Sequence, residues 1–268
     1  MRFVDFQVHL PTDREKGDYL GQQKYQPGEW AQELAPKSEE LYIVPTVTNR
    51  EYTQQDKEYI DAAQQQEQIE VLGRGIEIDS GRRSINIISQ EPDINFFEDA
   101  ETKYELVYAA EQHLEEQNDS FALLSHPFSK DGGLLRDSKP RSYEVQALSD
   151  MERLAGDHQT NAWLETFRKQ PWKTLNHLND DRFGLKQEYS DLELEIPDIA
   201  SSDIKDPGLA GTSRNPLNRE PESPIDAYQQ ARQNTTQVNQ IPTSIMLRKL
   251  GSGIPPIKNT YEKIINQN

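Results

Sequence analysis

From its first residue to about Asp203, the chain alternates between short apolar runs rich in β-branched residues and longer amphipathic stretches. The apolar runs predict strands over residues 1–10, 41–47, 69–78, 84–88, 121–124, 143–148 and 191–202. The amphipathic stretches predict helices over residues 27–34, 53–68, 97–117 and 151–179, the last of them broken at Pro171. Strands that alternate with helices in this way indicate an α/β barrel rather than a sandwich or a helix bundle.

The pattern changes after residue 208. Residues 209–222 are rich in Pro, Asn, Ser and Arg, which is typical of a loop or linker. Two further helices are expected over residues 226–237 and 257–265. We therefore predict a barrel over residues 1–211 and a C-terminal helical and loop extension over residues 212–268 that packs on it.

Composition and charge restrict the partners. The formal net charge is -17 at pH 7, and such a surface repels phosphate backbones and anionic lipid. We therefore expect no DNA or membrane partner, and the charge argues against RNA. The sequence contains no cysteine, which excludes disulfides, thiolate metal ligands and Cys nucleophiles. No apolar run is long enough to span a bilayer, and the chain begins with a strand pattern rather than a signal peptide, so we predict a cytoplasmic protein.

Four residues with metal-ligating side chains fall at predicted strand ends: His9, Glu77, His126 and Asp203. A barrel assembles a metal site from single ligands at several strand ends, because each strand presents one side chain at the rim. Imidazole and carboxylate groups together suit a divalent cation such as zinc, manganese or iron.

Five segments around these residues resemble motifs of the PHP (polymerase and histidinol phosphatase) superfamily. VDFQVHL at residues 4–10 is similar to the family's D-x-H-x-H strand, VTNR at 47–50 to its T-D-H turn, and GIEI at 75–78 to its G-x-E strand. SHPF at 125–128 resembles its H-P-F motif, and IASSDIK at 199–205 its closing G-S-D-x-H. The resemblance covers roughly residues 1–211. It implies a distorted seven-stranded (β/α) barrel of the TIM type that holds up to three metal ions and hydrolyses phosphate esters.

The chain keeps only part of the ligand set that this resemblance implies. His9, Glu77, His126 and Asp203 match family ligands, whereas other ligand positions carry Gln7, Asn49, Arg50, Asn86 and Lys205. Neutral amides are poor zinc ligands, and a fixed cation opposes metal binding at short range. The resemblance therefore implies either no metal or one divalent ion. That ion would be held by His9, Glu77 and Asp203, with Gln7 as a further ligand and His126 at a second position.

Two functions follow from this interpretation. The first is a binding or interaction protein, a hydrolase-like pseudoenzyme with weak or lost phosphoesterase activity, in which Arg50 and Lys205 neutralise the remaining acids. The alternative is a single-metal phosphoesterase that acts on a small phosphate ester. In that case His126 would serve as the proton donor, and Arg50 and Lys205 would bind the phosphate. The expected partner is a small phosphorylated molecule or another protein.

Overall fold

The computed structural model of the chain describes residues 1–12, 25–34, 40–79, 84–97, 103–125, 148, 151–159, 196–202, 207–211, 213–234 and 237–238. Three of the predicted site residues, His126, Asp203 and Lys205, lie outside these ranges. So do the helix predicted over residues 257–265 and all but Leu148 of the strand predicted over residues 143–148.

The described residues form ten strands, four α-helices and two short 3-10 helices. The strands are β1 (Arg2–His9), β2 (Glu40–Thr48), β3 (Ile69–Val71), β4 (Arg74–Asp79), β5 (Ser84–Ser89), β6 (Phe121–Leu124), β7 (Leu154–Gln159), β8 (Asp198–Ser201), β9 (Ser213–Leu217) and β10 (Gln237–Val238). The helices are α1 (Pro27–Leu34), α2 (Gln54–Gln64), α3 (Lys103–Glu116) and α8 (Pro224–Gln233), with 3-10 turns η1 (Asn95–Phe97) and η3 (Pro207–Leu209).

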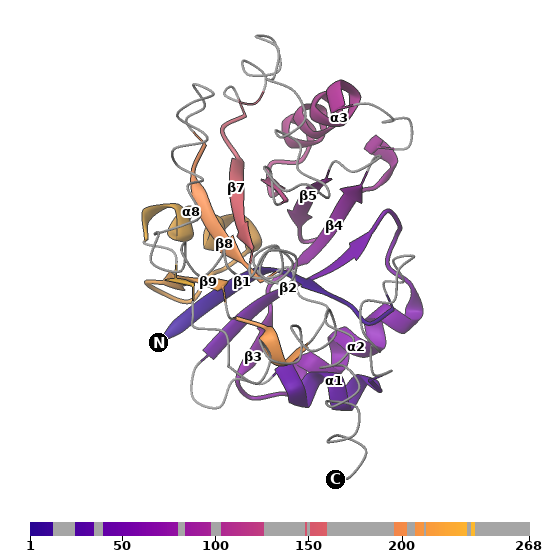
Figure 1. Ribbon diagram of the computed structural model, residues 1–268, viewed down its shortest axis with the longest axis vertical. Helices are drawn as coiled ribbons and strands as arrows, with labels where there is room; N and C mark the ends of the chain where they lie inside the picture. The colour runs from indigo at the N-terminus through magenta and orange to yellow at the C-terminus, as the bar shows by residue number, and fades with distance from the viewer. Residues whose placement is uncertain are drawn as a thin grey trace, which may run out of the picture.

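All ten strands belong to one mixed sheet, in the order β10-β9-β1-β2-β4-β5-β6-β7-β8, with β3 paired to β2 (Figure 1). Strands β1, β2 and β4 are parallel, whereas β5 runs antiparallel to both β4 and β6. The fold is thus mixed α/β with a strongly curled sheet. The predicted α/β class is confirmed, but the distorted TIM-like barrel is not a closed one, because within the described residues no backbone ladder joins β8 to β1.

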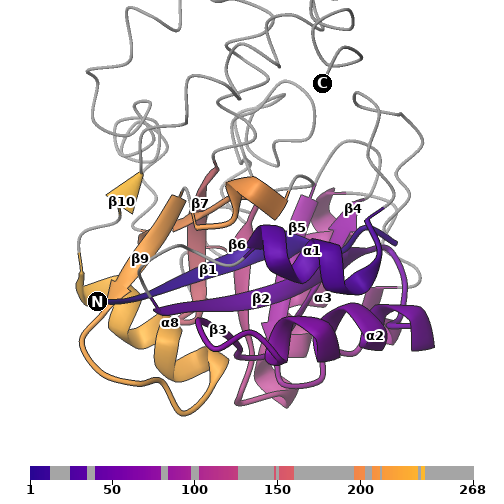
Figure 2. The ribbon, with the colours of Figure 1, turned by 90° about the horizontal axis from the view of Figure 1, so that it is seen from below.

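Aromatic contacts on one face show how strongly the sheet curls. Phe6 of β1 and Phe121 of β6 are four positions apart in the strand order, yet their ring centroids lie 5.2 Å apart. In a flat sheet of this spacing the strands would be about 19 Å apart, so this face is concave. Tyr228 of α8 stacks on Phe121 at 4.6 Å. Helix α8 therefore packs on the concave face, near the N-terminal end of β1 (Figure 2).

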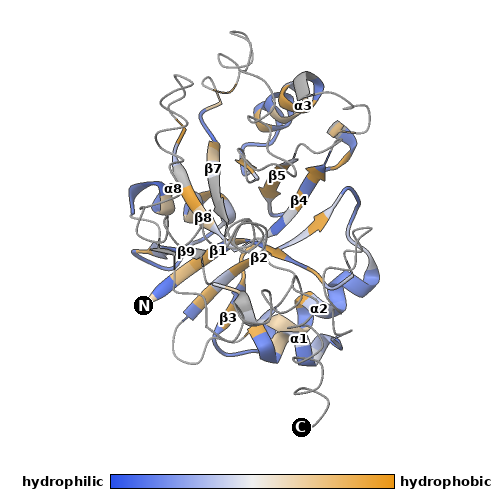
Figure 3. Cartoon of the chain, viewed as in Figure 1, coloured by the Kyte–Doolittle hydropathy of each residue, from blue (hydrophilic) through white to orange (hydrophobic). Residues whose placement is uncertain are grey.

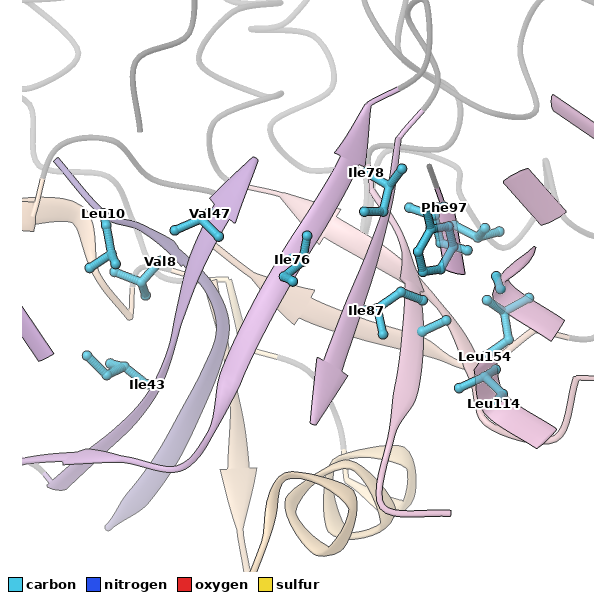
Figure 4. Packing of buried hydrophobic residues seen from close by; sticks show 14 of the residues in the cluster. Val8, Leu10, Ile43, Val47, Ile76, Ile78, Ile87, Phe97, Leu114 and Leu154 are labelled. Atoms are coloured by element: carbon cyan, nitrogen blue, oxygen red, sulfur yellow. The ribbon is translucent and has the colours of Figure 1, made fainter. Parts of the chain in front are cut away.

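The opposite, convex face carries the larger apolar core. Ile43, Ile76 and Ile87 point to this face from three different strands (Figure 4). Helices α1, α2 and α3 cover it with buried residues such as Trp30 and Leu114. Hydrophobic residues are frequent on the strands, while helices α1 and α2 carry hydrophilic residues beside hydrophobic ones (Figure 3).

A side chain joins the two strands that a closed barrel would pair through their backbones. Asn215 of β9 lies opposite Val4 of β1 and is fully buried. Its amide accepts a hydrogen bond from the Ala200 N–H at 2.8 Å and donates to the Ala200 carbonyl at 2.7 Å. It also donates to the Val4 carbonyl at 3.4 Å. The amide of Asn215 thus takes the place of a backbone peptide group between β8 and β1.

Most of the predicted elements are confirmed where the structure describes them. These are the strands expected near residues 1–10, 41–47, 69–78, 84–88, 121–124 and 191–202 and the helices expected near 27–34, 53–68, 97–117 and 226–237. The helix predicted over residues 151–179 is wrong over Leu154–Gln159, which forms β7 between two strands. The linker predicted over residues 209–222 is wrong over Ser213–Leu217, which pairs with β1 as β9.

Candidate functional site

Polar side chains occupy the concave face beyond its apolar layer. Val44 of β2 and Ile88 of β5 belong to the apolar cluster on this face. Thr46 and Asn86 lie two residues from them in the same strands, and their side chains therefore point to the same face. Residues of this polar layer are buried even though they are hydrophilic: Gln7, His9, Thr46, Glu77 and Asn86. They lie near the carboxyl ends of the parallel strands, where α/β sheets commonly bind ligands.

His9 is the centre of this layer. Its Nε2 atom lies 3.2 Å from Oε2 of Glu77 and 3.2 Å from the amide nitrogen of Gln7. An imidazole nitrogen carries either one hydrogen or one lone pair. With the Gln7 amide nitrogen facing the ring, His9 Nε2 cannot donate to Glu77 and accept from Gln7 at the same time. With the amide turned so that its oxygen faces the ring, one N–H would have two acceptors. A single nitrogen therefore has two polar neighbours at the distance typical of groups that share a proton or a cation.

An irregularity in β1 brings Gln7 and His9 to the same side. The register of β1 with β2 shifts between Asp5 and Val8, as in a β-bulge. Val8 points into the convex core, and His9 therefore points to the concave face. The carboxylate of Asp5 fixes the irregular stretch, because it accepts a hydrogen bond from the Gln7 N–H at 3.3 Å.

Asp5 also anchors two distant segments to β1. Its carboxylate accepts hydrogen bonds from the Ser202 N–H at 2.9 Å, from the Ser202 hydroxyl and from the Gly211 N–H at 2.8 Å. Burial raises the pKa of Asp5 to about 6, although these hydrogen bonds act in the opposite direction. Asp5 thus holds the residue that precedes Asp203 against the strand that carries His9.

Glu77 of β4 and Asn86 of the adjacent strand β5 are direct partners in the antiparallel register. Gly75 lies two residues before Glu77 on the same face of β4 and has no side chain. A Cβ atom at this position would lie 2.7 Å from the Thr46 hydroxyl and 3.0 Å from the Asn86 amide oxygen. Glycine is therefore required here, because it lets these two side chains approach the backbone of β4.

Arg50 lies close to Asp56. Its guanidinium donates to the two carboxylate oxygens of Asp56 at 2.6 and 3.0 Å, and to the Thr12 hydroxyl at 3.1 Å. Burial alone would raise the pKa of Asp56, but hydrogen bonds from Arg50, from the Thr12 hydroxyl and from the N–H and hydroxyl of Thr53 outweigh it and lower this pKa to about 2. The ion pair of Arg50 within the described residues is thus with an acid of helix α2.

Asn49 connects the ends of two strands. It has a φ of 50°, a left-handed conformation that Asn tolerates better than most residues. Its side-chain amide donates to the Asp79 carbonyl and accepts from the Asp79 N–H, both at 2.8 Å. Asn49 thus extends the contact between β2 and β4.

The structure brings His9, Glu77 and Gln7 together, and it places Arg50 in a separate ion pair with Asp56. His126, Asp203 and Lys205 remain predictions. Sequence reasoning missed Asp5 and Asp56, although the Thr53-x-x-Asp56 spacing is a recognisable helix-capping signal. Among the residues that the structure describes, no group of three or more His, Cys, Asp or Glu side chains could hold a metal ion.

Comparisons with known proteins include a likeness to a solved structure. The chain is similar to the crystal structure of PsfC from Pseudomonas syringae PB-5123, with 12% sequence identity and a TM-score of 0.46 over 97% of this chain and 98% of that chain. No family model matches the chain, and no curated protein matches it significantly. Within the described ranges, no helix is long and apolar enough to cross a membrane.

Proposed function

We propose that the chain is a divergent PHP-like protein that has kept one cation position, has lost most of the phosphoesterase activity of that family and acts as a binding protein. The observation that carries this proposal is the approach of Glu77 and Gln7 to a single imidazole nitrogen of His9. A cation shared by these groups would resolve their conflict over one proton.

The distances between these groups fit a shared ion. Two ligands of one zinc ion, each about 2.1 Å from it, lie about 3.0–3.4 Å from each other. The separation of 3.2 Å between His9 Nε2 and Glu77 Oε2 falls in this range. His9 and Glu77 would hold the ion, and the Gln7 amide oxygen would be a weaker third ligand. Such an ion supplies Lewis-acid chemistry and lowers the pKa of bound water.

The remaining positions favour binding over multi-metal catalysis. Asn49 uses its amide to join two strands, and Asn86 offers a neutral amide where the family pattern has a histidine. Neutral amides do not replace the charge and basicity of His or Asp ligands. We therefore propose that the second and third metal positions are lost, and that the ligand is a small phosphorylated molecule or a protein partner in the cytoplasm.

One observation favours a single-metal phosphoesterase as a second candidate. A guanidinium beside Glu77 would oppose a cation at that carboxylate. The structure instead pairs Arg50 with Asp56 at 2.6 Å, which directs its guanidinium towards the start of helix α2. In this candidate, His126 would be the proton donor and Lys205 would bind the phosphate.

Two measurements on the purified protein distinguish the candidates: Mn²⁺ binding and Mn²⁺-dependent hydrolysis of para-nitrophenyl phosphate. The first proposal predicts Mn²⁺ binding that Glu77→Gln weakens at least about tenfold, with no hydrolysis above the protein-free rate. Glu70→Gln is the matched control, because Glu70 is exposed on the neighbouring strand β3. Hydrolysis that is lost in Glu77→Gln and retained in Glu70→Gln would replace the first candidate with the second.

A further inference from the structure

Asn86 is a buried side chain whose hydrogen-bonding capacity is unused. Its exposed fraction is 0%, and neither its amide nitrogen nor its amide oxygen has a hydrogen-bond partner. Most buried polar side chains are hydrogen-bonded, because an unsatisfied buried amide is costly. Asn215 shows the usual arrangement in the same sheet, since its buried amide has bonds on both of its atoms. The unsatisfied amide of Asn86 therefore suggests a hydrogen-bond partner that is not part of the protein.

The surroundings of Asn86 place it in the candidate site. Ile85 and Ile87, its neighbours in β5, belong to the convex core, so Asn86 faces the concave side. Its register partner in β4 is Glu77, and its amide lies over Gly75. The amide therefore shares the polar layer with the carboxylate that contacts His9.

A second buried group without a partner follows the next strand. Ser125 comes directly after β6 and is fully buried, and its hydroxyl has no hydrogen-bond partner. The register pairs Asn86 with Leu123, two residues before Ser125. Side chains two residues apart share a face of a strand, so Ser125 lies on the same face as Leu123 and Asn86. It is one step nearer the carboxyl end of β6 than the Asn86–Leu123 pair. Two adjacent strands thus each contribute one unsatisfied polar group.

The chemistry of these groups indicates which ligand they would take. A carboxamide offers both a donor and an acceptor, and a serine hydroxyl does the same. The carboxylate of Glu77 lies directly opposite Asn86 and disfavours a second negative charge. We propose that Asn86 and Ser125 form a subsite for an uncharged polar group of the bound molecule, a hydroxyl or a carboxamide, and not for its phosphate. This inference rests on the proposed function of the concave layer as a binding site.

Side-chain amide resonances of the full-length protein test the subsite without any added metal. The Asn86 resonance is assigned by its loss in Asn86→Leu, and glycerol, acetamide and inorganic phosphate are titrated in the presence of a chelator. We expect glycerol or acetamide to shift this resonance and phosphate to leave it unchanged. We also expect about tenfold weaker binding of the same probe to Asn86→Leu, the loss expected for one or two hydrogen bonds. Because no metal is present, this result is independent of the cation position at His9.

Thermal unfolding provides the matched control. Asn86→Leu should leave the unfolding temperature unchanged or raise it, because it removes unsatisfied polar atoms. Asn215→Leu should lower it, because that amide is fully bonded. The proposal is overturned if Asn86→Leu destabilises the protein as much as Asn215→Leu, which would mean that ordered water already satisfies the amide. It is also overturned if no hydroxyl or carboxamide probe moves the Asn86 resonance, or if only phosphate does.

Discussion

Tyr52 compensates for a proline in the middle of a strand. Strand β2 pairs with β3 up to Ile43 and with β4 from Thr46 onwards, and Pro45 lies between the two ladders. The hydroxyl of Tyr52 lies 2.6 Å from the carbonyl oxygen of Pro45 and 2.8 Å from that of Gly75. It also accepts a hydrogen bond from the Gly75 N–H at 3.1 Å. One side chain thus bridges the place where β2 changes partner.

Replacing this hydroxyl should be costly. Tyr52→Phe leaves backbone groups of Gly75 and Pro45 without a partner, so the free energy of unfolding should fall by about 1–3 kcal/mol. Tyr59→Phe is the control and should cost less, because the Tyr59 hydroxyl donates to a single backbone group, the Tyr25 carbonyl, at 2.6 Å. Urea unfolding of both variants measures the difference. Equal stability of Tyr52→Phe and the parent would contradict this role.

Single residues also show where sequence reasoning reaches its limit. The strand-end positions of His9 and Glu77 could be predicted, because local apolar patterns define where strands end. The partner of Arg50 could not, since it depends on a side chain that folds back from the start of helix α2. The lack of hydrogen-bond partners for the amide of Asn86 could not be predicted either, because such partners depend on how the whole structure packs.

At the level of elements, the first turn of α2 combines a helix cap with an ion pair. Thr53 and Asp56 form a capping box, in which each side chain bonds to the backbone N–H of the other residue. Arg50 then binds the same carboxylate of Asp56 from the end of β2. The start of α2 is therefore tied to the end of β2 through one acid.

This arrangement predicts a dependence of stability on pH. The folded-state pKa of Asp56, about 2, lies below the value of about 3.9 for an unfolded chain. The ionised carboxylate of Asp56 therefore stabilises the folded state fully above pH about 4, and this stabilisation is lost as the pH falls towards 2. Urea midpoints of the parent should fall over this range, and those of Asp56→Asn should fall less steeply. Parallel pH profiles for the two proteins would rule the prediction out.

Elements that sequence reasoning missed have weak local signals. Strand β7 has the sequence LAGDHQ, in which no residue is β-branched or aromatic. Strand β9 has the sequence SRNPL, and a polar stretch with a proline is typical of a loop. Both form strands because neighbouring strands provide partners for their backbones, and a strand's own composition does not contain that information.

At the level of the whole molecule, side chains and not a backbone ladder join β8 to β1 within the part of the chain that the structure describes. Asn215 bonds to the backbone of Ala200, and Asp5 bonds to Ser202 and Gly211. The alternation of strands and helices predicted the α/β class correctly. It could not predict an open sheet, because closure depends on the pairing of strands that are nearly two hundred residues apart.

Removal of the Asn215 amide should weaken this join specifically. Asn215→Leu leaves the N–H and the carbonyl of Ala200 buried without partners, so we expect a loss of at least about 2 kcal/mol in the free energy of unfolding. In this variant the amide of Ala200 should also exchange with solvent faster than in the parent, whereas the amide of Ala122, which donates to the Arg153 carbonyl, should not. Unchanged exchange at Ala200 would show that β8 is held in place by other contacts.

The central claim is that one cation position remains on the concave face. Metal content of the purified protein, measured by mass spectrometry after equilibration with zinc and removal of the excess, tests this claim most directly. The account predicts one zinc ion per chain in the parent and in Glu70→Gln, and a clear loss in His9→Ala and in Glu77→Gln. Retention of several ions per chain, or of one ion that survives both substitutions at His9 and Glu77, would contradict it.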